Sequence, residues 1–126
     1  MSHGVLGLPP TESRISQSLS QGEKFVDQYY KTFSKSASKY YSPSTRVIWN
    51  GTAMSGDQFL LVLPELQQTM GHFDVHAFDA QPVGSLTMIN VSGVVKMKER
   101  VQFAQTFVVQ KTGTMTYIVS DCFRLV

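Results

Sequence analysis

Apolar side chains recur at three- and four-residue steps between residues 13 and 33, and charged or amide side chains fill many of the positions between them. The recurring positions are Ile15, Leu19, Gly22, Val26, Tyr29 and Phe33. This spacing places one apolar stripe along a helix of about five turns that begins at Ser13. A second, short helix is predicted over 34–41. It should end there because Pro43 disfavours helical backbone at Ser42.

The first eleven residues lack this periodicity. They contain Gly4, Gly7, Pro9 and Pro10, so residues 1–11 are predicted to form a flexible N-terminal arm. The total length of 126 residues fits one folding unit. We therefore expect a single domain over residues 12–126.

The middle of the chain combines a strand, a tight turn and a helix. Residues 46–50 predict a strand that ends in an Asn50-Gly51 turn. Ser55-Gly56-Asp57 then offers an N-terminal cap for a helix. That helix is predicted to run to Leu63, where Pro64 either ends or restarts it.

After Gly71 apolar and polar residues alternate, which is typical of strands. The predicted strands cover residues near 72–81, 86–98, 101–111 and 115–125, with turn residues at 82–84 and 111–113. Helices early in the chain and strands late predict an α+β fold in which helices cover one face of a curved antiparallel sheet.

The alternation assigns two faces to each of the last three strands. One face is strongly apolar, interrupted by Gly93, Gln105 and Asp121, and we expect it to pack against the helices. Its members are Ile89, Val91, Val95, Met97, Val101, Phe103, Phe107, Val109, Tyr117, Val119, Phe123 and Leu125.

The opposite face is nearly neutral. Apart from the strand end that holds Lys96, its one charged residue is Arg124. This face comprises Met88, Asn90, Ser92, Val94, Gln102, Ala104, Thr106, Val108, Ile118, Ser120, Cys122 and Arg124. A sheet face open to water usually carries Lys, Glu and Arg. This composition favours coverage by a second sheet and therefore a strong dimer, whereas the alternative is an exposed face rich in serine and threonine. The predicted interface residues are Asn90, Ser92, Ala104, Thr106, Val108, Ser120, Cys122 and Arg124.

Composition narrows the classes of function. Charged residues make up 16% of the chain, against roughly 25% in an ordinary soluble domain, whereas the hydrophobic share of 42% is near normal. The formal net charge is +2, and Glu99 interrupts the one basic run at 96–100, so we expect a solvated strand end and no specific nucleic-acid binding.

A single cysteine, Cys122, excludes an internal disulfide, and we expect a reducing compartment, no metal and no cofactor. The longest apolar run, 59–63, is too short to cross a bilayer, and we expect neither secretion nor membrane association.

Several short motifs, in order along residues 13–126, resemble the nuclear transport factor 2 family. They are Phe25-Val26-Asp27-Gln28-Tyr29-Tyr30, Val47-Ile48-Trp49-Asn50-Gly51 followed by Ser55-Gly56, Ala80-Gln81-Pro82, Phe103-x-Gln105-x-Phe107, and Ser120-Asp121-Cys122-Phe123-Arg124. The resemblance implies a cone formed by a bent antiparallel sheet wrapped around the N-terminal helices.

Two branches of that family must be distinguished. The homodimeric carrier that imports the GTPase Ran has acidic residues around its cavity, where this chain has Asn50 and the basic segment 96–100. Like charges and unpaired charges would oppose the same docking. The Trp-Asn-Gly and Ser-Asp-Cys-Phe-Arg motifs are more similar to the small subunits of mRNA export receptors.

That second branch implies a heterodimer with the large subunit of the export receptor. The receptor carries mRNA through the nuclear pore by contacting Phe-Gly repeats of nucleoporins, mainly through its large subunit. The implied location is the nucleus and the pore, with shuttling to the cytoplasm. The interface arginine of the family corresponds to Arg124, which would pair with a buried carboxylate of the partner.

The same fold also hosts enzymes, such as ketosteroid isomerase, that place an aspartate and a tyrosine in the cone. Asp121 with Tyr29 or Tyr30 is one candidate pair here, and Asp74 with His76 is another. We favour structural roles, with Asp121 bonded to a core tyrosine or to backbone and the other pair solvated at the sheet edge. Core positions are likewise expected for Trp49, Phe59, Leu60 and Leu63, although a ligand platform or a peptide groove is the alternative.

Overall fold

The computed structural model describes residues 11–126. The predicted arm over 1–11 lies outside the described residues except for Thr11. The helices are α1 (Glu12–Lys31), α2 (Phe33–Ser36), η1 (Ala37–Tyr40) and α3 (Gly56–Thr69). The strands are β1 (Arg46–Trp49), β2 (Thr52–Ser55), β3 (Phe73–Val83), β4 (Leu86–Lys96), β5 (Arg100–Thr112) and β6 (Met115–Leu125).

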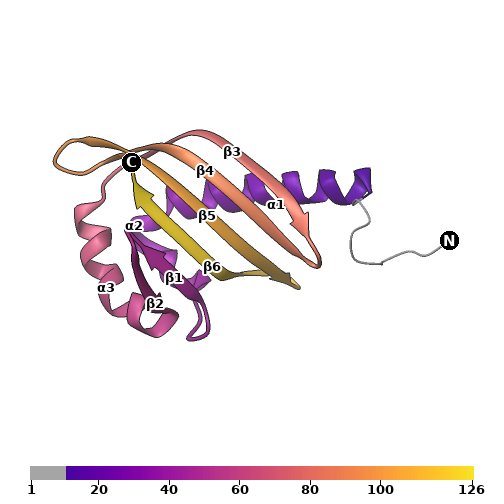
Figure 1. Cartoon of the computed structure of the whole chain (residues 1–126), viewed down its shortest axis with the longest axis horizontal. Helices are drawn as coiled ribbons and strands as arrows, with labels where there is room; N and C mark the ends of the chain where they lie inside the picture. Colours follow the sequence, from indigo (N-terminus) through magenta and orange to yellow (C-terminus); the bar gives the residue numbers. More distant parts are fainter. Residues whose placement is uncertain (1–10) are drawn as a thin grey trace.

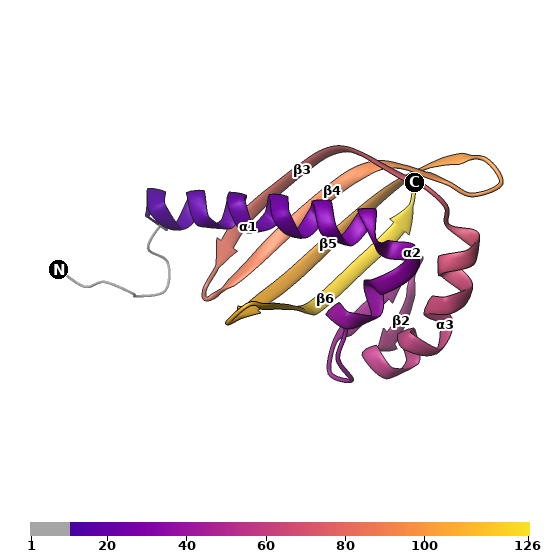
Figure 2. The same ribbon diagram turned by 180° about the vertical axis from the view of Figure 1, so that it is seen from behind.

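Within residues 11–126 the strands form one six-stranded sheet in the order β2-β1-β6-β5-β4-β3. Strands β1 and β6 pair in parallel, and every other neighbouring pair is antiparallel. Figure 1 views the open face of the sheet, and Figure 2 shows α1 crossing the opposite face. The predicted α+β class, with helices on one face of a bent sheet, is confirmed.

Helix α1 begins at a side-chain cap, because Oγ1 of Thr11 accepts a hydrogen bond from the Arg14 amide (3.3 Å). The helix buries the later part of its predicted apolar stripe, from Gly22 onward, against the sheet. The prediction was wrong for the first two positions, because Ile15 and Leu19 are 39% and 43% exposed. Gly22 allows the closest approach: a Cβ at this position would lie 2.5 Å from Cβ of Ala80 on β3. The missing side chain therefore sets how near α1 lies to the edge strand.

Helix α3 is longer than predicted. Ser55 caps it as expected, in a capping box with Gln58. It then continues through Pro64 to Thr69 instead of ending near Leu63. Pro64 lacks the amide that would donate to the carbonyl of Leu60, and the helix continues despite the loss of this one bond.

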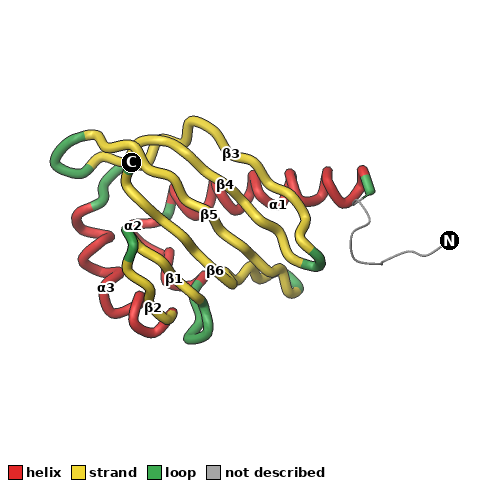
Figure 3. Tube along the Cα trace, viewed as in Figure 1, coloured by secondary structure: helices red, strands yellow, loops and turns green. Residues whose placement is uncertain are grey.

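The turn at Asn50-Gly51 is confirmed, but the strand β2 that follows it was not predicted. Asn50 and Gly51 have φ angles of 48° and 85°, which suit a two-residue hairpin turn. Figure 3 shows the short hairpin that β1 and β2 form at one edge of the sheet. Four residues with little burial give β2 almost no apolar alternation from which to predict it.

The face assignment for the start of β6 was wrong. Val108 pairs with Ser120, but its neighbour Val109 pairs with Ile118, so Val119 is an extra residue in β6. This β-bulge reverses the alternation before it. Ile118 consequently lies in the core at 1% exposure, whereas Tyr117 points away from the core and is 38% exposed.

The core between sheet and helices is predominantly aromatic. Trp49 stacks on Phe123 with ring centroids 4.1 Å apart and lies 5.1 Å from Phe59. Phe59 and Leu63 are fully buried, and Leu60 packs against them. The predicted core positions are confirmed, and these side chains form neither a ligand platform nor an open groove.

Candidate partner interface

The face of the sheet opposite α1, called the outer face below, brings all eight predicted interface residues together. The register across β4, β5 and β6 aligns Asn90 with Thr106 and Cys122, Ser92 with Ala104 and Arg124, and Val108 with Ser120. Most of their neighbours along the strands are buried in the core, so the strand alternation placed these eight residues correctly, although it had wrongly added Ile118 to the same face.

Small uncharged side chains make up the centre of the outer face. Oγ1 of Thr106 donates a hydrogen bond to Oδ1 of Asn90 (2.8 Å), which links β5 to β4 on this surface. Cys122 is a free, exposed thiol. No group of three His, Cys, Asp or Glu side chains that could hold a metal occurs within residues 11–126.

Arg124 lies near the C-terminal end of β6, beside Ala104 on this surface. It is exposed, and the salt bridges of residues 11–126 do not include it. It follows the buried Phe123, and its strand neighbour on β5 is Ala104. The guanidinium is therefore available to a carboxylate of another molecule.

The flanking strands add side chains that the sequence reading of this face did not include. Ile48 on β1 lies opposite Cys122 and is 45% exposed, so it extends the apolar part of the surface. Arg46, also on β1, lies opposite Ser120 of β6. At the other edge of the sheet, Asp79 on β3 lies opposite Asn90 of β4. The outer face thus carries charge at both of its borders as well as at Arg124.

A buried hydrogen-bond network lies directly beneath the outer face. The Tyr41 hydroxyl donates to Oδ2 of Asp121 (2.5 Å), and Nε2 of Gln105 donates to Oδ1 (2.7 Å). Tyr30 donates to Oε1 of Gln105 (2.7 Å), and the hydroxyls of Tyr29 and Tyr41 are 2.7 Å apart. Because Tyr41 donates to the carboxylate, it accepts from Tyr29. The prediction that Asp121 bonds to a core tyrosine is confirmed.

Burial governs the ionisation of this network. Desolvation raises the pKa of Asp121 to about 6, although the hydrogen bonds from Gln105 and Tyr41 partly offset it. Burial also raises the pKa of Tyr29, Tyr30 and Tyr41 well above the usual tyrosine value. The tyrosines therefore stay neutral donors at physiological pH.

Two cavities touch the network, and neither joins Asp121 to a tyrosine. One, of about 700 Å³, lies between β1, β2 and the start of α3 and reaches Asp121 but no tyrosine. The other, of about 750 Å³, lies between α1 and β3 and reaches Tyr30 but not Asp121. The arrangement that an isomerase-type acid–base pair would need is absent from both cavities.

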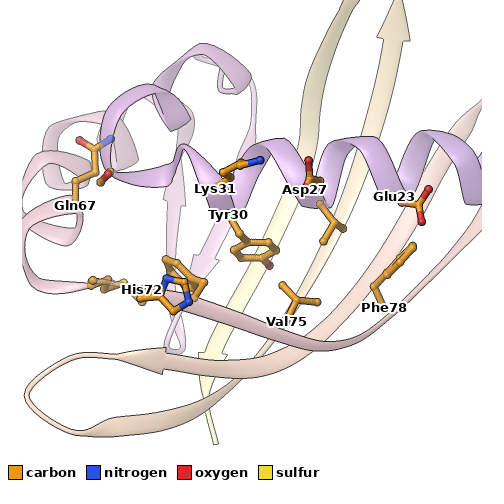
Figure 4. Close-up of a pocket in the computed structure, with 13 residues that line it drawn as sticks. Glu23, Asp27, Tyr30, Lys31, Gln67, His72, Val75 and Phe78 are labelled. Carbon is orange, nitrogen blue, oxygen red and sulfur yellow. The ribbon is translucent and has the colours of Figure 1, made fainter.

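Figure 4 shows the second of these cavities. Glu23, Asp27 and Lys31 line its rim on α1, while Val75 and Phe78 on β3 face them. The rim carries both signs of charge above an apolar floor. None of the eight predicted interface residues lines it.

The second candidate acid–base pair does not form. A bulge between Val75 and Ala77 takes His76 out of the strand register. Asp74 instead lies 3.2 Å from Nε2 of His72 and accepts a hydrogen bond from Arg100 (3.1 Å). The hydrogen bond from Arg100 is the main reason that the pKa of Asp74 is lowered. This exposed cluster has the form of a solvated strand-end ion pair.

Comparison with known proteins agrees with this architecture. Residues 21–125 match the nuclear transport factor 2 (NTF2) domain. The chain belongs to the nuclear transport factor 2 family. A solved member of the family, nuclear transport factor 2 from Cryptosporidium parvum, superimposes with a TM-score of 0.73 over 94% of this chain and 100% of that chain, at 22% identity. The cone-type fold expected from the motifs is thus confirmed.

Two characterised relatives place the chain more narrowly within the NTF2 family. It is 32% identical over 130 residues to NTF2-related export protein 2 of Homo sapiens, covering 87% of this chain and 88% of that protein. It is 29% identical over 126 residues to NTF2-related export protein 1 of Bos taurus, covering 87% and 89%. The chain is therefore an NTF2-like protein related to export proteins. None of the helices in residues 11–126 has the length and apolarity that crossing a membrane requires.

Proposed function

We propose that this NTF2-like protein is the small, non-enzymatic subunit of an mRNA export receptor, and that it binds the large subunit through the outer face of its sheet. The observation that carries the proposal is Arg124, an exposed cation on a nearly neutral surface that takes part in no salt bridge within residues 11–126. The similarity to two NTF2-related export proteins supports the same class of function.

The composition of the outer face suits a protein partner. Its centre consists of small neutral side chains, which cost less to desolvate than charged ones, and Ile48 adds exposed apolar area. Arg124 would pair with a carboxylate of the large subunit, which fixes the register of the complex and rejects partners without one.

A homodimer is less well supported by the charges on this face. In a two-fold dimer the outer face meets a copy of itself, so Arg124 needs an acid from the same surface. The carboxylates there are Asp74, which already pairs with His72 and Arg100, and Asp79, which lies on the edge strand β3. A different chain can supply an acid opposite Arg124 directly.

Import of the GTPase Ran is the alternative for an NTF2-like protein, and two features oppose it. Oδ1 of Asn50 accepts a hydrogen bond from the Leu125 amide (2.8 Å), so this side chain holds the end of β6 and offers no negative charge. The nearby 96–100 turn carries three cations and one anion. An acidic ring for a cationic partner cannot form from these residues.

The proposal places the protein in the nucleus and at the nuclear pore, with shuttling to the cytoplasm. Contact with the Phe-Gly repeats of nucleoporins would pass mainly through the large subunit. The buried, hydrogen-bonded state of Asp121 supports a structural role rather than catalysis.

Native mass spectrometry of the chain alone and of the chain mixed with a large export-receptor subunit tests the proposal. We expect a one-to-one heterodimer in the mixture. Two other outcomes would contradict it: a homodimer that persists in the presence of the large subunit, or stable capture of GDP-bound Ran.

A further inference from the structure

A second surface, on the helix side of the molecule, gathers three lysines from distant parts of the sequence. Lys24 of α1, Lys39 of η1 and Lys111 at the end of β5 line one cavity of about 320 Å³. In Figure 2 the turn that joins β5 to β6 lies at the lower left end of the sheet. We propose that this cavity is a binding site for a phosphate monoester.

The charge of the cavity has one sign. Its lining contains no Asp or Glu, and none of the three lysines forms a salt bridge within residues 11–126. The three exposed lysines around one small cavity give it a positive potential, and an anion held between them would be attracted by all three.

Helical geometry separates this cavity from the mixed-charge cavity beside β3. Gln21, Lys24 and Gln28 follow three- and four-residue steps and therefore share one side of α1, whereas Glu23 and Asp27 line the cavity on the other side. The acidic residues of the same helix are thus directed away from the lysines.

Neutral hydrogen-bond donors complete the lining. The side-chain amides of Gln21 and Gln28 and the hydroxyls of Thr114 and Thr116 line the same space. Gly113, with a φ of 62°, makes the turn between Lys111 and the two threonines. The donors therefore come from α1 and from the β5–β6 turn.

The floor of the cavity is aromatic and buried. Phe25 and Tyr40 meet edge to face with centroids 5.3 Å apart, and the Lys39 ammonium lies 5.1 Å from the Tyr40 ring centroid. A low-dielectric floor strengthens the attraction between the lysines and an anion above it. The cation–π contact also restrains Lys39 at the rim.

A phosphate monoester fits these donors better than a carboxylate. It carries about −1.5 to −2 charges at pH 7 and three acceptor oxygens, so it can meet three ammonium groups together with hydroxyl and amide donors. A carboxylate has one charge and two oxygens and would leave most of the positive charge uncompensated. The phosphate could belong to a modified side chain of another protein or to a free phosphorylated metabolite.

This site does not depend on the proposed export function. None of its lining residues belongs to the eight predicted interface residues of the outer face, and the cavity lies on the helix side of the sheet. Loss of anion binding and loss of partner binding are therefore separate results.

Titration of inorganic phosphate into the isotope-labelled chain, followed by backbone amide shifts at pH 7 and constant ionic strength, tests the site. We expect saturable shifts at residues 111–116 and 39–40. The triple variant Lys24→Gln/Lys39→Gln/Lys111→Gln should bind about tenfold more weakly or worse. The charge-matched control Lys31→Gln/Lys35→Gln/Lys98→Gln removes three lysines outside the cavity and should bind like the wild type.

Equal weakening in both triple variants, or shifts that never saturate, would overturn the proposal. If the first triple variant does not fold, Lys111→Gln alone in the exposed turn should still weaken binding by about threefold against Lys98→Gln. Two further probes distinguish the sources of the phosphate. Tighter binding of a phosphoserine peptide with neutral flanks indicates a modified protein, and tighter binding of inositol hexakisphosphate indicates a free metabolite.

Discussion

The hydroxyl of Tyr41 lies 2.5 Å from Oδ2 of Asp121 and donates a hydrogen bond to it. The two residues are 80 positions apart in the sequence, and both are buried in the core. Asp121 lies on β6 between Ser120 and Cys122, whose side chains point to the outer face. The bond therefore fixes the strand that carries the predicted partner surface to the segment just after η1.

Replacement of Asp121 by asparagine should change how stability depends on pH. The pKa of Asp121 is about 6 in the folded chain, against the usual 3.8 of an aspartate, so the folded chain holds this proton more tightly than the unfolded chain does. The free energy of unfolding should therefore fall as pH rises from about 4 to 6. Asp121→Asn keeps an acceptor for Gln105 but turns an amide donor toward Tyr41, whose hydroxyl must then reverse and accept. Because the variant cannot ionise, it should lose the fall in stability with pH, which amounts to about 3 kcal/mol in the wild type.

Urea unfolding between pH 4 and 7 measures this effect. The matched control is Asp79→Asn, which changes an exposed aspartate on β3. An Asp121→Asn variant that keeps the pH dependence of the wild type would contradict the assignment of a raised pKa to Asp121.

Gly93→Ala should destabilise the fold severely. A Cβ at this position would lie 2.0 Å from the carbonyl oxygen of Asp74, and backbone cannot move aside as a flexible side chain can. We expect a loss of about 3 kcal/mol or more in thermal or urea unfolding. The adjacent Ser92→Ala change is on the outer face and should cost no more than about 0.5 kcal/mol. Equal stability of the two variants would be inconsistent with the close β3–β4 approach.

The thiol of Cys122 offers a direct report on coverage of the outer face. It is exposed in the single chain and should react readily with iodoacetamide. In the complex with a large export-receptor subunit, burial should slow the reaction by about tenfold or more. Mass spectrometry of the alkylated chain gives the rate. An unchanged rate in a complex shown to be intact would mean that the partner binds elsewhere.

Most of the fold could be predicted from the sequence because its long elements have strong periodicity. The apolar stripe of α1 and the alternation of β3 to β6 fixed their types and nearly their ends. Strand β2 was missed because four mostly exposed residues carry no such pattern. Helix α3 was predicted too short because a proline usually ends or kinks a helix, whereas this helix continues through Pro64 to Thr69.

The two β-bulges explain the errors in side-chain placement. The bulge at Val119 exchanged the faces of Tyr117 and Ile118, and the irregularity at His76 removed it from Asp74. A bulge changes the alternation by one residue and leaves no clear signal in a single sequence. Cys122 and Arg124 follow the bulge at Val119 along β6, so the alternation still placed both of them correctly.

The lysine cavity shows a different limit of sequence reasoning. Lys24, Lys39 and Lys111 form no run in the sequence and are brought together only by the packing of α1, η1 and the β5–β6 turn. The basic run that the sequence does show, 96–100, lies at another end of the sheet and pairs partly with Asp74.

The most direct test of the partner interface is the affinity of the Arg124→Glu variant for a large export-receptor subunit, measured by titration calorimetry. Loss of a desolvated ion pair costs about 3–5 kcal/mol, so heterodimer affinity should fall by about a hundredfold or more while the isolated chain unfolds as the wild type does. Lys35→Glu makes the same charge change on α2 and should bind normally. Wild-type affinity of the Arg124→Glu variant would contradict the proposal that this face, through Arg124, holds the partner.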